Sequence, residues 1–373
     1  MMQEPTLGFT EKVIFALRAL YDRYGYTQYR MSKFEEYDLY ARNKDFLISD
    51  SVITFTDTNG RLMALKPDVT LSIVKNTLDT DAVQKLYYNE NVYRVSKGAR
   101  AFREIMQVGL ECLGDIDDYI IYEVLVLAAR SLMTISEKSI LDISDLSLLS
   151  ELIDSIGVPA DKKSDLLKCI GEKNRHELTA ICRDAGVSED NIAVLTKLIA
   201  LSGPAADILP QVRQLIGDIV DKAELDSFSS IIEALSLTDI APMLRIDFSV
   251  VDDVHYYNGI VFKGFIDSVP TSVLSGGQYD KLMQKMGRTS GAIGFAVYMD
   301  AIERLGIQKK DFDVDIVVLY DGTSPISAVQ KWVKAFMDSG SSVLVQRELP
   351  EGLKCRQLMK ITNGEVEFLE NNA

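Results

Sequence analysis

Apolar positions at the start of the chain recur with the period of an α-helix. Phe9, Val13, Leu17 and Leu20 lie three or four residues apart, which predicts an amphipathic helix over residues 8–25. Further helical patterns follow at residues 38–42, 71–77 and 117–135, and in successive segments between 145 and 238. The chain therefore begins with helices interspersed among other elements and continues into a mostly helical stretch.

The strongest strand signal is a hairpin at residues 53–68. Asn59-Gly60 separates two runs rich in β-branched and apolar residues, and this dipeptide is typical of a tight turn between antiparallel strands. A further strand is predicted just upstream, at residues 26–35. Together these patterns predict a small antiparallel unit near the N-terminus.

A second pair of strands is predicted over residues 84–114, joined by a basic loop that contains glycine. In the return strand, Gln107, Gly109 and Glu111 lie two residues apart and share one face, whereas the apolar Val108 points to the other. Polar residues on the inner face of a strand indicate a ligand pocket on the surface of the sheet.

The last third of the chain returns to β structure. Strands are predicted at residues 243–251, 256–267 and 271–274, a turn at 275–278, and helices at 278–287 and 292–305. The segment 313–373 begins a new pattern of strand, helix and strand, which predicts a βαβ unit in a small separate domain.

The charge of the chain restricts its partners. It has 373 residues, with 40 Lys and Arg against 55 Asp and Glu, so the net charge is −15. A surface of this sign repels phosphate backbones and argues against nucleic-acid binding. The 4 cysteines form no CxxC pair, and His176 and His255 are far apart, so no zinc motif is predicted.

No targeting or membrane segment is expected either. Glu4, Glu11 and Arg18 interrupt the N-terminal apolar run, which is unlike a signal peptide. The longest apolar stretch begins at Tyr119, contains Glu123, and is much shorter than the roughly 20 residues that span a bilayer. A cytoplasmic protein is the expectation.

Three local motifs have ordinary explanations. LSGGQ, which begins at Leu274, matches the signature loop of ATP-binding-cassette ATPases, but the chain lacks the phosphate loop GxxxxGK[ST] that such an ATPase needs. The basic cluster from Lys97 to Arg103 could hold a phosphate, yet a charge cluster of this kind is usually a solvated hairpin tip, and this explanation is favoured. His255 has no Ser, Cys or paired acid at the spacing of a catalytic triad.

Five motifs taken together change the interpretation. They are TFTDTNGRLMALKPDVT, YNENVYRVSKGARAFREIMQVGLECLG, VHYYNGIVF, LSGGQYDKL and AIGFAVYMDAIERL. In this order they resemble the catalytic core of histidyl-tRNA synthetase. The resemblance implies an α+β fold, the class II aminoacyl-tRNA synthetase-like antiparallel sheet flanked by helices. It also implies a core of residues 1–144 and 239–308, a helical insertion of residues 145–238, and a shortened anticodon-binding-like α/β domain of residues 309–373.

The departures from this family lie where ATP would bind. Asp252, Gln278 and Ala301 stand at positions where synthetases have Arg, and Ser96 replaces the acid that reads adenine. Amino-acid activation depends on cations around the transferring phosphoryl group, so these losses imply that aminoacylation is lost. The candidate remnants of a phosphate-binding site are Arg94 and Arg103.

The amino-acid side of the implied pocket is better retained. The matching histidine-binding positions are Asp68, Thr70, Gln107, Glu111, Tyr256 and Tyr257. Carboxylates can hold an α-ammonium group and an imidazole N–H, and a glutamine can fix the ligand's orientation. Asp68 stands where synthetases have Glu, in a Lys-Pro-Asp-x-Thr string that is typical of one paralogous family, the regulatory subunits of ATP phosphoribosyltransferase.

That second resemblance implies a non-catalytic protein without metal or cofactor. It would form a homodimer, join the short-form catalytic subunit in a hetero-oligomer, a hetero-octamer by analogy, and relay histidine feedback in the first step of histidine biosynthesis. No nucleic-acid or membrane partner is implied. Two alternatives stay open: a divergent, active histidyl-tRNA synthetase, and a synthetase-like protein that binds another amino acid.

Overall fold

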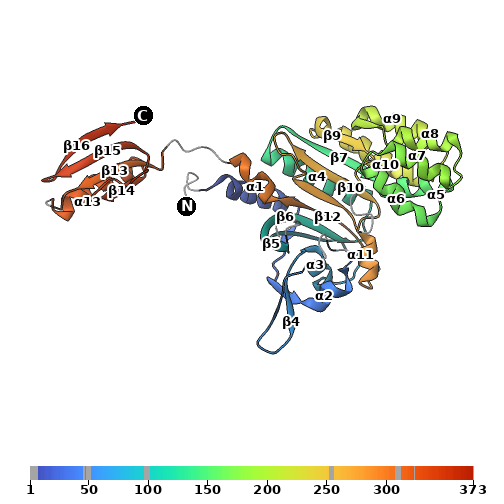
Figure 1. Ribbon diagram of the computed structural model, residues 1–373, viewed down its shortest axis with the longest axis horizontal. Coiled ribbons are helices and arrows are strands. Elements are labelled where there is room, and N and C mark those ends of the chain that lie inside the picture. Colours follow the sequence, from blue (N-terminus) through green and yellow to red (C-terminus); the bar gives the residue numbers. More distant parts are fainter. Residues whose placement is uncertain are drawn as a thin grey trace. The chain divides into compact units, whose positions relative to one another are not determined.

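The computed structural model describes residues 7–44, 47, 52–95, 101–251, 256–306, 312–322 and 324–372. The chain divides into two compact units, Met1–Gly306 and Ile307–Ala373. Each unit has its own sheet and its own buried core (Figure 1). Within the described residues, no helix is long and apolar enough to cross a membrane.

The larger unit is built on a mixed but mainly antiparallel sheet. Its nine described strands follow the order β1-β5-β6-β12-β11-β10-β7-β9-β8, with parallel pairs only at β1–β5 and β7–β9. The strands are β1 Thr27–Gln28, β5 Gln84–Val95, β6 Phe102–Gly114, β7 Ser139–Asp145, β8 Ser202–Pro204, β9 Leu244–Asp247, β10 Ile260–Ile266, β11 Leu274–Gln278 and β12 Gly291–Tyr298.

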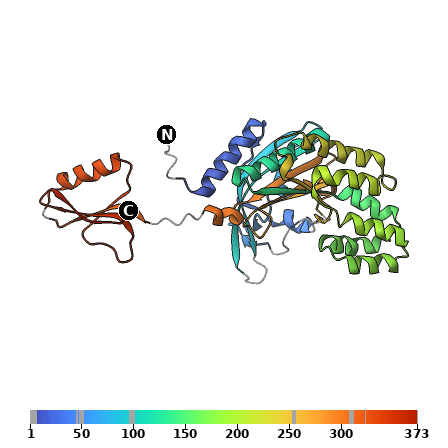
Figure 2. The same ribbon diagram turned by 90° about the horizontal axis from the view of Figure 1, so that it is seen from above.

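Two helices, α1 Phe9–Arg23 and α4 Asp118–Ile135, cover one face of this sheet (Figures 1 and 2). Both belong to the same buried core as Val108 and Leu110 of β6. The predicted alternation along β6 is therefore confirmed, because its apolar residues face these helices. Helix α4 is apolar on most sides because it also packs against a further helix, α10 Lys222–Ser236.

The opposite face carries a small antiparallel sheet and short helices. Strands β2 Phe34–Glu36, β4 Leu62–Leu65 and β3 Thr54–Thr56 pair in that order. Helices α2 Tyr37–Arg42 and α3 Thr70–Asn76 adjoin them, as predicted.

The predicted hairpin is confirmed by its turn. Gly60 has a φ of +79°, which favours glycine, and the Asp57 carboxylate accepts backbone N–H groups from Asn59 and Arg61 at 2.8 Å each. The strand predicted over residues 26–35 is shorter than expected, because only its two ends, β1 and β2, pair with neighbours.

The run of helices predicted between 145 and 238 is confirmed, with the addition of the short strand β8. Side-chain N-caps begin four of these helices: Asp145, Asn174, Ser188 and Asp221. Besides α10, the helices of this run are α5 Leu146–Ser155, α6 Ala160–Gly171, α7 Arg175–Asp184, α8 Glu189–Leu198 and α9 Ala205–Ile216. Their status as a separate insertion stays a prediction.

Two sequence-based assignments are wrong. The segment AIGFAVY, predicted as helix, is strand β12, and the helix α12 begins only at Met299 and ends at Ile302. Because β12 lies between β6 and β11 with both faces covered, its apolar run is continuous and lacks the alternation of a half-exposed strand. The LSGGQ segment, predicted as a turn, is strand β11, and helix α11 Asp280–Lys285 follows it.

The smaller unit confirms the predicted βαβ pattern. Strands β13 Val314–Tyr320 and β14 Val343–Gln346 are parallel and joined by helix α13 Ile326–Asp338. Two further strands, β15 Cys355–Thr362 and β16 Glu365–Asn371, complete a sheet of order β14-β13-β15-β16. Trp332 of α13 packs on its core.

Candidate functional site

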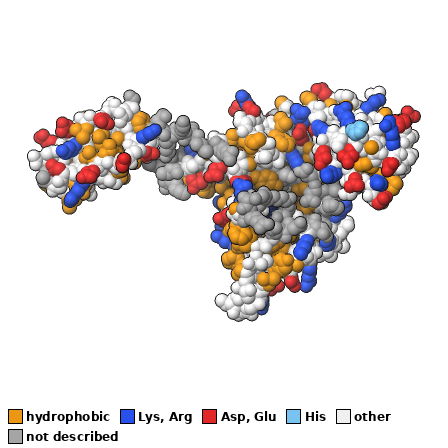
Figure 3. All heavy atoms as spheres, in the orientation of Figure 1, with side chains coloured by type: hydrophobic (Ala, Val, Ile, Leu, Met, Phe, Trp, Pro, Cys, Tyr) orange, Lys and Arg blue, Asp and Glu red, His pale blue; other side chains and the backbone are white. Residues whose placement is uncertain are grey.

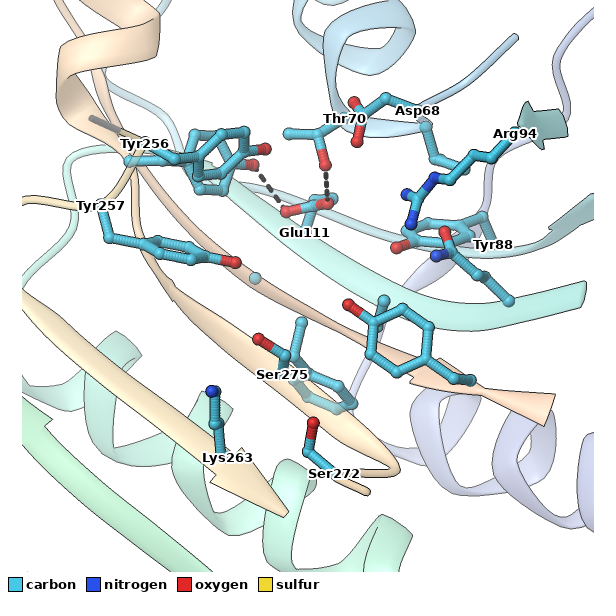
Figure 4. A pocket seen from close by; sticks show the side chains of 17 residues that line it. Asp68, Thr70, Tyr88, Arg94, Glu111, Tyr256, Tyr257, Lys263, Ser272 and Ser275 are labelled. Atoms are coloured by element: carbon cyan, nitrogen blue, oxygen red, sulfur yellow. Dashed lines mark hydrogen bonds between the residues drawn. The ribbon is translucent and has the colours of Figure 1, made fainter. Parts of the chain in front are cut away.

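A cavity of about 220 Å³ opens on the face of the large sheet opposite α1 and α4 (Figure 4). Strands β5, β6, β10, β11 and β12 contribute to its lining, as does the start of α3. The lining residues are Asp68, Val69, Thr70, Tyr88, Arg94, Gln107, Glu111, Tyr256, Tyr257, Lys263, Ser272, Ser275, Tyr279, Gly294, Phe295, Ala296 and Tyr298. The structure thus brings all six predicted histidine-binding residues together.

Glu111 lies at the centre of the acidic side of this cavity. Its carboxylate accepts hydrogen bonds from the Thr70 hydroxyl at 2.8 Å and the Tyr279 hydroxyl at 2.6 Å (Figure 4). The side chain is buried, and burial raises its pKa from 4.5 to about 8. A buried carboxyl of this kind ionises readily only when a cationic or N–H-donating ligand group approaches it.

Asp68 supplies a second carboxyl beside Glu111. It precedes α3, and its Oδ1 accepts the backbone N–H of Leu71 at 2.9 Å. Burial raises the pKa of Asp68, and the charge of Arg94 partly offsets this increase. The Arg94 Nε donates to the carbonyl of Pro67 at 3.0 Å, which fixes that guanidinium next to the start of α3.

Tyrosine side chains form much of the wall. The rings of Tyr256 and Tyr257 are 4.8 Å apart between centroids, and those of Tyr256 and Tyr279 are 5.7 Å apart. Burial raises the pKa of each hydroxyl, so all remain neutral hydrogen-bonding groups at physiological pH. Tyr88 and Tyr298 complete the set.

Glycines leave room for these buried side chains. A Cβ atom on Gly294 would lie 1.8 Å from the Glu111 Oε2, and one on Gly277 would lie 2.8 Å from the Tyr257 ring. The second glycine of the LSGGQ segment is thus explained by close packing within β11, with no role for nucleotide binding.

Sequence reasoning did not single out several lining residues. Tyr88 lies in the strand predicted at the start of residues 84–114, where it pairs with Gly109, so strand alternation could have found it. Tyr279 belongs to the quoted motif LSGGQYDKL, but it follows a segment predicted as a turn, so no alternation pointed to it. Lys263, on β10, had no such signal, because a single lysine in an apolar strand is commonly solvated.

Only one member of the predicted phosphate-binding pair is among the residues that line the cavity. Arg94 lines the cavity, whereas Arg103, its cross-strand partner, has a side chain 58% exposed and lies 3.6 Å from the Asp300 carboxylate. Gln278 accepts the backbone N–H of Ile260 at 2.8 Å through its side-chain oxygen, and Ala301 packs against the large core. The other predicted positions, Ser96, Lys97, Asp252 and His255, lie outside the described residues.

Among the described residues, no group of three or more His, Cys, Asp or Glu side chains is arranged to hold a metal ion. The lining residues make the cavity a polar pocket with tyrosines in its wall and carboxyls on one side.

The mainly antiparallel sheet, its flanking helices and this pocket define a class II aminoacyl-tRNA synthetase-like protein. Residues 3–302 match the family model described as histidyl-tRNA synthetase, and the chain belongs to that family.

Curated relatives of the chain include proteins named ATP phosphoribosyltransferase regulatory subunit. The chain is 25% identical over 353 residues to an ATP phosphoribosyltransferase regulatory subunit of Bacillus cereus strain AH820, covering 92% of this chain and 83% of the relative. A protein of the same name from Bacillus thuringiensis strain Al Hakam is 26% identical over 331 residues, covering 86% and 78%.

Solved structures share the fold. A protein from Bacillus halodurans, described as an ATP phosphoribosyltransferase regulatory subunit/histidyl-tRNA synthetase, aligns with a TM-score of 0.73 at 21% identity, covering 92% of this chain and 91% of that one. Histidyl-tRNA synthetase from Nostoc sp. PCC 7120 gives 0.71 at 15%, covering 99% and 96%. A chain of the ATP phosphoribosyl transferase (HisG:HisZ) complex from Thermotoga maritima gives 0.60 at 17%, covering 77% and 96%.

Proposed function

We propose that this chain is the non-catalytic regulatory subunit of ATP phosphoribosyltransferase, the enzyme of the first step of histidine biosynthesis. The curated relatives that match it over most of their length carry that name. The fold is also that of a chain in a solved complex of this enzyme. In this role the chain activates a separate catalytic subunit, and its pocket binds histidine as the feedback signal.

The observation that carries the proposal is the asymmetry of the pocket. Its amino-acid side keeps two buried carboxyls, Asp68 and Glu111, with tyrosine hydroxyls around them. At two positions where synthetases have Arg, the Gln278 side chain accepts a backbone hydrogen bond within the sheet, and Ala301 packs against the large core. An arrangement of this kind favours amino-acid binding over ATP activation.

Histidine fits the retained groups. Asp68 and Glu111 supply carboxylates for the ligand's ammonium and imidazole N–H groups, and Thr70 and Gln107 supply neutral hydrogen-bonding partners. Tyr256 and Tyr257 give the apolar wall against which an imidazole ring packs. Histidine can then inhibit the catalytic subunit by favouring one assembly state of the complex over another. By thermodynamic linkage, the state that histidine favours must bind histidine more tightly.

In the proposed assembly, two copies of this chain form a homodimer. Such homodimers join the short-form catalytic subunit in a hetero-oligomer, a hetero-octamer. Apolar side chains are exposed on the β2-β4-β3 sheet, where Phe34 is 46% and Leu62 is 49% exposed, and they gather beside the hairpin in Figure 3. A second copy of the chain is a suitable occupant for such a surface. The net charge of −15 argues against RNA as a partner.

The direct test mixes the purified chain with a short-form catalytic subunit. We expect a complex by size-exclusion chromatography with light scattering, and a gain in ATP phosphoribosyl transfer that histidine reverses. The absence of both a complex and a gain in activity would contradict the proposal. A histidine-dependent ATP–pyrophosphate exchange would instead establish an active synthetase.

Histidine binding is tested separately by calorimetry against the twenty amino acids. The variant Glu111→Gln keeps the shape of the pocket but cannot ionise when the ligand binds, so we expect histidine affinity to fall by about tenfold or more. Glu104→Gln, on the exposed part of the same strand, is the matched control and should bind histidine as the unmodified chain does. Preferential binding of another amino acid would contradict the choice of histidine.

A further inference from the structure

The sequence leaves the carboxylate of an amino-acid ligand without an obvious partner, and the structure places an unexpected cation in the pocket. Lys263 of β10 lines the cavity. Figure 4 shows its side chain pointing between Tyr257 and Ser275, on the side of the cavity away from Asp68 and Arg94. Lysine is thus part of the pocket wall.

The strand register explains how Lys263 reaches the cavity. Lys263 pairs with Ser275 of β11, Ser275 pairs with Ala296 of β12, and Ala296 pairs with Gly109 of β6. All four side-chain positions lie in one row across the sheet and on one face. Because the three residues beside Lys263 are small, no bulky side chain of this row separates the ammonium group from the acidic side.

The two sides of the cavity carry different ionisable groups, carboxyls on one side and an amine on the other. Glu111 lies on β6 and Lys263 on β10, three strands away, which corresponds to about 14 Å between their backbones. Long side chains extend into this gap from both ends, and the space between them suits a small zwitterion. The other cation that lines the described cavity, Arg94, lies beside Asp68 on the acidic side.

We propose that Lys263 binds the α-carboxylate of the amino-acid ligand and thereby fixes its direction in the pocket, with the ammonium and imidazole toward Asp68 and Glu111. This inference rests on the proposed amino-acid binding and adds a residue that selects carboxylated ligands. Burial lowers the pKa of Lys263, and a bound carboxylate would stabilise its charged form. Ser272 and Ser275 line the same cavity, and Ser275 pairs with Lys263 across β10 and β11.

The test compares two ligands that differ at one group. L-Histidine carries the carboxylate, whereas L-histidinol has a hydroxymethyl group in its place and keeps the amine and the imidazole. In the unmodified chain we expect histidinol to bind about 10- to 100-fold more weakly than histidine, the usual effect of losing a charged hydrogen bond. Equal affinities for both ligands would overturn the inference without any variant.

The variant Lys263→Met tests whether this side chain causes the difference in affinity between histidine and histidinol. It removes the charge but keeps an unbranched apolar stem, so we expect histidine affinity to fall to about the level of histidinol while histidinol affinity is unchanged. Lys263→Arg should restore most of the preference for histidine. Lys197→Met, on the exposed surface of α8, is the control and should change neither affinity.

Two results would overturn the assignment. One is an equal loss of both ligands in Lys263→Met, with a lowered melting temperature, which would mark Lys263 as structural. The other is the absence of any amino-acid binding to the unmodified chain. The second result would not decide the regulatory role. That role is tested by complex formation and by activation of the catalytic subunit, which are measured without histidine.

Discussion

Glu111 acquires its chemistry from residues that are distant in sequence. Thr70 lies 41 positions before it and Tyr279 lies 168 positions after it, yet both hydroxyls donate to its carboxylate. Burial in this setting raises the pKa to about 8, so the carboxyl is mostly protonated at pH 7 in the unliganded chain. Glu111 is therefore expected to lose its proton when a cationic group of a ligand binds beside it.

We predict that histidine binding at pH 7 releases a proton from Glu111. A cationic ligand group favours the carboxylate and lowers its pKa, so affinity should rise by about fivefold between pH 7 and pH 8. Calorimetry in buffers of different ionisation enthalpy measures the number of protons released. Glu111→Gln should remove this release, and an unchanged release in that variant would show that another group titrates.

The same raised pKa predicts the pH dependence of folding. A carboxyl whose folded-state pKa lies above its unfolded value contributes stability below about pH 4.5 that is lost as the pH rises through about 8. We expect the free energy of unfolding of the unliganded chain to fall by a few kcal/mol across this window. Urea titrations at several pH values should show a smaller decrease for Glu111→Gln than for the unmodified chain.

At the scale of elements, the pocket depends on strands that approach one another closely. Strand β12 lies in the middle of the sheet, and Gly294 pairs with Glu111 on one side and with Gly277 on the other. A Cβ atom on Gly294 would meet the Leu110 carbonyl at 2.4 Å as well as the Glu111 carboxylate. Backbone cannot move aside as the end of a flexible side chain can, so this position admits no side chain.

Gly294→Ala should therefore destabilise the large unit by about 2–4 kcal/mol and abolish histidine binding. Gly203→Ala is the matched control, because Gly203 is also a strand residue and a Cβ there would lie at an ordinary 3.4 Å from Ile208. We expect the control to change stability by less than about 1 kcal/mol. Chemical denaturation followed by circular dichroism measures both, and equal effects would refute the steric argument.

At the scale of the whole molecule, the chain consists of two separately built units. The core of the larger one includes Leu125 and Phe262, whereas Val318, Met359 and Ile361 belong to the core of the smaller one. Every described residue that lines the cavity belongs to the larger unit. Ligand binding and the smaller unit should thus be separable.

A chain that ends at Gly306 should fold and bind histidine with an unchanged Kd. The reason is that the larger unit keeps its whole sheet, both core clusters and all described lining residues. Thermal unfolding with and without histidine, together with calorimetry, checks this expectation. Loss of folding or a Kd changed by more than tenfold would mean that the smaller unit supports the pocket.

The sequence by itself determined much of the local structure. Helical spacing placed α1 and α4, Asn59-Gly60 placed a hairpin, and the alternation around Gly109 placed polar residues on one face of β6. These features depend on residues close together in the chain, so the periodicity of side chains is enough to reveal them. The ordered motifs likewise indicated the synthetase family that the family model confirms.

The tertiary structure alone decided the rest, because it depends on contacts between distant segments. The apolar run of β12 is a strand only because strands cover both of its edges and both faces are buried, a context that its own sequence does not contain. Lys263 likewise joins the pocket through the register of β10 against β11. Periodicity reveals which face a residue occupies, whereas the neighbours it meets there are set by how the whole sheet is assembled.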